Sequence, residues 1–109
     1  MPDRIEETPE LRRLRKRIDA LDRRLVDLLN ERAALAREAG RAKTAAGRRA
    51  IRDAEREREV LLRVSMANTG PLPQADLVAL YRRLFVATRA LEARDRRAAT
   101  PTTDDADGG

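Results

Sequence analysis

The chain has 109 residues, of which 39% are charged and only 2% aromatic, and its formal net charge is +5. This length is enough for one domain, and the abundance of Ala, Arg, Leu and Glu favours long helices over a β-sandwich. Cysteine and histidine are both absent, which excludes a disulfide framework, a thiolate nucleophile and the commonest metal ligand. Any chemistry must therefore use Arg, Lys, Asp, Glu and hydroxyl groups.

The charge is concentrated in the middle of the chain. Residues 1–10 hold one base and four acids, and residues 98–109 hold three acids and no base. Taking −3 and −3 from +5 leaves residues 11–97 at +11, a charge that attracts nucleic acid, an acidic partner or a small polyanion. No apolar run has the length of a membrane span and no signal peptide precedes the domain, so we expect a cytoplasmic protein without a membrane partner.

The first predicted helix begins at Thr8-Pro9-Glu10, which is typical of a helix start, and runs to about Lys43 or Ala46, where Gly47 can end it. Its apolar positions are spaced alternately by three and four residues, as in helices packed on helices. This row, called the seam below, comprises Leu11, Leu14, Ile18, Leu21, Leu25, Leu28, Leu35 and Ala39, with Arg32 as its one polar member. A helix of this length spans ~50 Å, whereas a compact domain of this size has a radius of gyration of only ~13 Å. The helix would therefore extend beyond its own domain and leave the seam exposed. We expect a second copy of the chain to cover the seam in a homodimer. A longer coiled coil is the alternative.

Two shorter helices are predicted after it, over residues 52–68 and from Pro73 onward. The turn between them is Asn68-Thr69-Gly70-Pro71. The fold class is therefore all-α, with one helical domain over residues 9–97. The tails, residues 1–8 and 98–109, have little to bury and are expected to be disordered.

Four polar residues occupy faces that should be apolar: Arg32, Glu57, Thr88 and Glu92. Each alone has a structural explanation, such as a snorkelling side chain, an ion pair within one helix or a hydroxyl bonded to the preceding turn. Together they place cationic and carboxylate groups in one interior, which suits the binding of a polar anion.

Two further cations share a stripe of the first helix. Arg15 and Lys43 are 28 residues apart, which is ~42 Å along a helix, whereas Lys43 and Arg32 are ~16 Å apart. One small ligand could therefore reach Lys43 and Arg32, and Arg15 only from a second, antiparallel subunit.

Three blocks, residues 14–43, 51–59 and 81–92, resemble the AroQ-class chorismate mutases, and the resemblance covers about residues 11–95. It implies an intertwined homodimer of three-helix chains in which Arg15 is donated in trans. It also implies an isomerase of aromatic amino-acid biosynthesis that rearranges chorismate, a small dicarboxylate, to prephenate without metal or cofactor.

The resemblance also implies a role for each matching residue. Arg15 and Arg32 would bind the substrate carboxylates, Lys43 would bridge a carboxylate and the ether oxygen, and Thr88 would replace a usual Ser beside the ring carboxylate. Glu92 stands where the bacterial pattern has Gln, which donates to the ether oxygen. We hypothesise that burial and the substrate's charge raise the pKa of Glu92, against the effect of Lys43, so that it donates as a neutral acid.

The remaining residues of the implied site surround the ring hydroxyl. Asp53 and Glu57 would position that hydroxyl, and Arg56 would support them.

Three alternatives remain open at this stage. A mutase acting on 4-amino-4-deoxychorismate and an isochorismate pyruvate lyase share the fold, although Glu57 argues against the lyase. A basic protein binding nucleic acid or an acidic partner is the alternative of another class, but there are few aromatic residues to stack on bases and no helix-turn-helix spacing.

Overall fold

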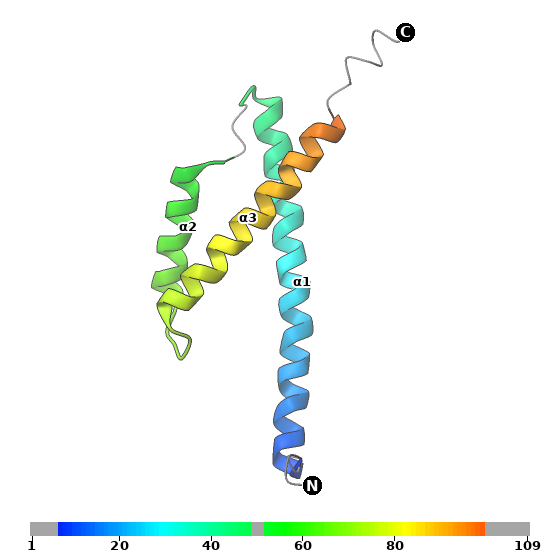
Figure 1. Ribbon diagram of the computed structural model, residues 1–109, viewed down its shortest axis with the longest axis vertical. Helices are drawn as coiled ribbons and strands as arrows, with labels where there is room; N and C mark the ends of the chain where they lie inside the picture. Colours follow the sequence, from blue (N-terminus) through cyan, green and yellow to red (C-terminus); the bar gives the residue numbers. More distant parts are fainter. Residues whose placement is uncertain (1–6, 49–51, 100–109) are drawn as a thin grey trace. The chain divides into compact units, whose positions relative to one another are not determined.

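The computed structural model describes residues 7–48 and 52–99, which form three helices: α1 (Pro9–Ala45), α2 (Ala54–Ala67) and α3 (Gln74–Ala99) (Figure 1). No strand occurs among these residues, which confirms the all-α prediction. None of the helices that they form combines the length and apolar character that a membrane crossing requires. The chain divides into two units, residues 1–34 and 35–109, and each is described separately below.

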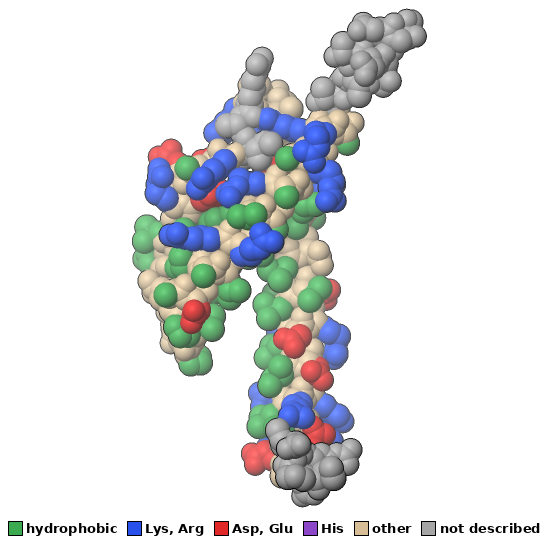
Figure 2. Space-filling model, in the orientation of Figure 1, with side chains coloured by type: hydrophobic (Ala, Val, Ile, Leu, Met, Phe, Trp, Pro, Cys, Tyr) green, Lys and Arg blue, Asp and Glu red, His purple; other side chains and the backbone are tan. Residues whose placement is uncertain are grey.

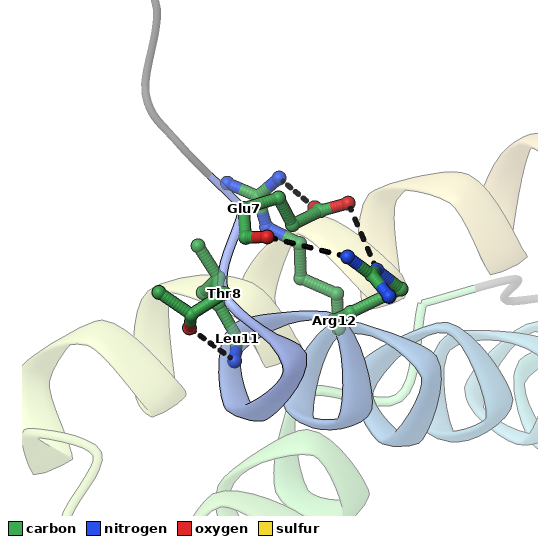
Figure 3. Close-up of polar contacts among 5 residues, drawn as sticks. Glu7, Thr8, Leu11 and Arg12 are labelled. Carbon is green, nitrogen blue, oxygen red and sulfur yellow. Dashed lines mark hydrogen bonds and ion pairs between the residues drawn. The ribbon is translucent and has the colours of Figure 1, made fainter.

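The start of α1 is fixed by local hydrogen bonds (Figure 3). The Thr8 hydroxyl oxygen accepts a hydrogen bond from the Leu11 amide at 3.1 Å, which satisfies one of the free amides of the first turn. Arg12 donates to the Glu7 carbonyl at 3.3 Å, and its guanidinium lies 3.8 Å from the Glu7 carboxylate. The predicted helix start is thus confirmed, and Glu7 and Thr8 form the cap although they belong to the segment expected to be disordered. Residues 1–6 of that segment lie outside the described residues.

The seam is exposed along the first unit. Ile18, Leu21 and Leu28 are each 54% exposed and Leu25 is 55% exposed, and α1 contains no buried residue. Figure 2 shows hydrophobic side chains along one side of this segment. Apolar rows of this length are normally covered in a functional protein, because each exposed Leu or Ile forgoes roughly 1.5–3 kcal/mol of burial free energy.

The end of α1 is a glycine-terminated cap. Gly47 has a φ of 85°, its amide donates to the Thr44 carbonyl at 3.0 Å, and the Arg48 amide donates to the Lys43 carbonyl at 2.9 Å. This pair of bonds is the Schellman arrangement, which needs a left-handed residue after the helix. The predicted stop at Gly47 is confirmed, and Lys43 is held in the last turn.

In the second unit α2 packs against α3. Phe85 of α3 is the one buried hydrophobic residue among those described, and its ring contacts that of Tyr81 edge-on, with centroids 6.3 Å apart. Asp53 caps α2 by accepting a hydrogen bond from the Arg56 amide at 3.0 Å, so α2 begins at Ala54, two residues later than expected. Helix α3 ends at Ala99 and so includes the first two residues of the segment 98–109 that was expected to be disordered; residues 100–109 lie outside the described residues.

Candidate active site

Within the second unit, α1 and α3 approach each other beside Lys43. A Cβ atom added to Gly40 would meet Cγ of Glu92 at 3.2 Å and its carboxyl carbon at 3.3 Å. Gly40 costs about 1 kcal/mol in a helix interior relative to Ala. This glycine therefore makes the room in which the Glu92 side chain lies against α1, one turn before Lys43.

An ion pair holds the two helices together next to that contact. Arg37 donates two hydrogen bonds to Asp95, at 2.9 Å from Nε and 2.7 Å from Nη2. The hydrogen bond from Arg37 and its charge hold the pKa of Asp95 below its usual range. Such two-point pairing fixes orientation as well as distance, and it joins α1 to α3 beside the contact of Glu92 with Gly40.

Glu92 is half-buried in this crossing, and burial raises the pKa of its carboxyl above the ordinary value. The positive charges of Lys43, Arg96 and Arg89 act in the opposite direction, and the nearby Asp95 adds to the increase. Burial is the largest of these effects, because the partly desolvated carboxylate loses more hydration than the cations restore. This direction agrees with the hypothesis made from the sequence, and the protonation state of Glu92 stays a prediction.

Asp53 lies at the start of α2. Its hydrogen bond from the Arg56 amide holds the pKa of Asp53 below the usual range, and the charges of Arg48 and Lys43 lower it further. The Arg48 guanidinium is 3.7 Å from the Asp53 carboxylate. Asp53 is therefore an ionised acceptor in the electrostatic neighbourhood of Lys43.

Glu57, also on α2, is held by two guanidinium groups. Arg52 donates to one carboxylate oxygen at 3.3 Å, and Arg89 of α3 makes a short ion pair with the other. The Glu57 side chain is 16% exposed and that of Arg89 28% exposed. Arg89 is not among the residues predicted from the sequence, where its one signal is its place directly after Thr88 on the half-buried face of α3.

Four predicted site residues remain: Arg56, Thr88, Arg32 and Arg15. The Arg56 guanidinium pairs with Glu59 at 2.8 Å along α2, so Arg56 supports Asp53 through its backbone amide. Thr88 is half-buried on α3. In the first unit Arg32 is half-buried in the seam, and Arg15 pairs with Glu7 at 2.6 Å.

The second unit thus brings together one cation of α1, carboxylates of α2 and α3, and the guanidinium of Arg89. No group of three or more acidic side chains that could hold a metal ion occurs among residues 7–48 and 52–99. The fold and these side chains define the class of protein: an all-α domain whose candidate site is built from charged side chains of three helices.

The chain belongs to the chorismate mutase type II family, whose model matches residues 14–93. It is 35% identical to the chorismate mutase (form II) of Thermus thermophilus, with a TM-score of 0.73 over 78% of this chain and 96% of that one. Form I of the same enzyme is 34% identical, with a TM-score of 0.69 over 72% of this chain and 98% of that one. These similarities confirm the family suggested by the sequence blocks.

Longer relatives share the same domain. The chain is 39% identical over 92 residues to a bifunctional chorismate mutase/prephenate dehydratase of Stutzerimonas stutzeri, covering 81% of this chain and 25% of the relative. The corresponding protein of Aquifex aeolicus is 41% identical over 87 residues, covering 76% and 24%. The chain therefore spans about a quarter of the length of these relatives.

Proposed function

We propose that this chain is a chorismate mutase that converts chorismate to prephenate. The observation that carries the proposal is the contact of Glu92 with Gly40 one turn before Lys43, together with the effect of the Lys43 charge on the Glu92 carboxyl. The family and the Thermus enzymes add independent support.

The rearrangement is unimolecular: the ether C–O bond of the enolpyruvyl group breaks while a C–C bond forms to the ring. No proton, nucleophile or external electron pair is transferred, so the protein has to hold the reactive conformer and stabilise charge that grows on the ether oxygen. Holding the conformer removes an entropic barrier, and preformed donors stabilise the oxygen. In this proposal Lys43 donates to the ether oxygen and neutral Glu92 donates beside it.

The ring end of the substrate is bound by α2. Asp53 and Glu57 are both acceptors, and a ring hydroxyl would donate to Glu57. Thr88 lies on α3, one turn before Glu92. Its hydroxyl would donate a hydrogen bond to the ring carboxylate.

The remaining cations complete the site in a homodimer. The exposed seam supports a second copy of the chain as its cover, because residues such as Ile18 and Leu25 have no cover within the described chain. Arg32 binds a substrate carboxylate, and Arg15 reaches the other subunit's site, where substrate displaces Glu7 from its guanidinium. The expected cytoplasmic location stays a prediction.

The test is an incubation of the purified chain with chorismate, 4-amino-4-deoxychorismate and isochorismate in turn, with products identified by mass and ultraviolet spectrum. Prephenate from chorismate at the highest kcat/KM is the expected result. Pyruvate release from isochorismate, or preferred use of the amino substrate, would replace the proposal by one of the two related reactions. Salt-sensitive binding of DNA or RNA without turnover of any substrate would favour the nucleic-acid alternative.

A further inference from the structure

The ion pair between Glu57 and Arg89 joins α2 to α3 and is one of the least exposed ion pairs of the described residues. Arg89 comes directly after Thr88 and three residues before Glu92, so it lies on the face of α3 that carries the candidate site. Its charge also acts on Glu92. Arg89 is therefore within electrostatic reach of both carboxylates of the site.

Two geometric consequences follow for Glu57. Hydrogen bonds from Arg89 and Arg52 occupy one site on each carboxylate oxygen, and each oxygen keeps a further lone pair for a ligand. The side chain is also held by donors from two parts of the chain, so its free acceptor positions are ordered before a ligand binds.

The charge balance around Glu57 has a further consequence. One carboxylate faces two guanidinium groups, so its surroundings carry a net positive charge. A neutral hydroxyl can still donate to this carboxylate. A protonated amine bonded to Glu57, by contrast, meets two nearby cations, and Asp53, the other carboxylate of the ring end, already has the Arg48 guanidinium 3.7 Å away. This arrangement binds an ammonium group poorly.

We propose that Arg89 is a positioning and specificity-determining residue, which orients Glu57 as an acceptor and selects a ring hydroxyl over a ring ammonium group. The proposal rests on the proposed function, since it concerns the ring end of that same site. It assigns to Arg89 the choice between chorismate and its 4-amino analogue.

The test compares kcat/KM for chorismate and for 4-amino-4-deoxychorismate in the wild-type chain, Arg89→Met and Arg89→Lys. Loss of a charge-assisted hydrogen bond predicts a decrease for chorismate of about 10- to 100-fold in Arg89→Met, mainly through KM. The ratio of amino to hydroxy substrate use should rise by about tenfold, because a nearby cation is gone. Arg89→Lys should restore most of the selectivity, and Arg82→Met, which removes an exposed cation of the same helix, should change neither quantity.

A double-mutant cycle separates positioning from a general effect on folding. In a Glu57→Gln background, Arg89→Met should cost about twofold or less, because its partner is already altered. An equal loss in both backgrounds, an unchanged substrate ratio, or wild-type kinetics in folded Arg89→Met would overturn the role of Arg89. If Arg89→Met fails to fold by circular dichroism, wild-type selectivity in Arg89→Lys supports the role and lost selectivity overturns it. A wild-type chain that turns over neither substrate would instead refute the proposed function.

Discussion

Glu57 and Glu92 are two half-buried acidic side chains of the candidate site, and their surroundings differ. Glu57 lies between α2 and α3 with two guanidinium groups on its oxygens. Glu92 lies between α1 and α3 against Gly40, where burial outweighs the nearby cations and raises its pKa. In the proposed function this contrast lets a site without histidine use one carboxyl group as an acceptor and another as a donor.

This division matches the two ends of the proposed substrate. In the proposed function the ring hydroxyl needs an acceptor, the role assigned to Glu57, and the breaking ether bond needs donors, the role assigned to Lys43 and a protonated Glu92. Pairs of carboxyl groups whose environments differ in this way commonly take opposite roles in catalysis.

The largest effect should come from removing the cation at the ether end. Lys43→Ala should lower kcat by on the order of 10³-fold, because no other ammonium group can stabilise the growing negative charge there. Steady-state assays of prephenate formation measure the loss. Lys16→Ala, which removes an exposed ammonium group of the same helix, is the control and should retain activity. A Lys43→Ala chain with more than about a tenth of wild-type kcat would contradict the role of Lys43.

The acceptor end should be less sensitive. Glu57→Gln keeps the size of the side chain but removes its charge, so Arg52 and Arg89 lose their partner while the amide oxygen can still accept. We expect KM to rise about tenfold with a smaller change in kcat, since the hydroxyl is bound equally in the ground and transition states. A decrease in kcat as large as that of Lys43→Ala would contradict the assignment of Glu57 to binding of the ring hydroxyl.

Gly40→Ala tests the contact that places Glu92. The added methyl group would meet the Glu92 side chain at 3.2 Å, so Glu92 has to move by a few tenths of an ångström, and we expect a decrease in kcat of about 3- to 10-fold. Helix propensity acts in the other direction and stabilises the chain by up to about 1 kcal/mol. Thermal unfolding and kinetics measured together should therefore change in opposite senses.

Gly47→Ala is the matched control for that substitution. A Cβ at Gly47 has no neighbour within 4 Å, but the φ of 85° is strained for alanine. This variant should lose stability, whereas Gly40→Ala should not. Equal losses of stability and activity in both variants would remove the special role of Gly40.

The fold could largely be predicted from local signals. Thr8-Pro9 and Gly47 mark the ends of α1 because helix capping depends on neighbouring residues, and the seam follows from its spacing. The pairings between helices could not be predicted in this way. Arg37 and Asp95 are separated by 58 residues, and whether they meet depends on where α1 and α3 cross.

The site shows the same limit. Glu57 and Glu92 can be predicted as site residues because they are charged and stand at positions that should be apolar. The sequence offers no comparable reason to select Arg89 as a site residue among the many arginines. The sequence alone offers no reason for a glycine at position 40 inside a helix, and the structure supplies one, since Glu92 occupies the space of the missing side chain. Arg56 matched the family pattern, yet its guanidinium pairs with Glu59, because both lie on one side of α2.

The protonation of Glu92 is the central claim, and the pH dependence of kcat tests it most directly. Since the folded-state pKa of Glu92 is raised, the neutral donor prevails below that pKa and is lost as the pH rises through it. The wild-type chain should therefore lose activity with rising pH, whereas Glu92→Gln, which donates at every pH, should show a flat profile and higher activity at alkaline pH. Identical profiles for the two proteins would contradict the account.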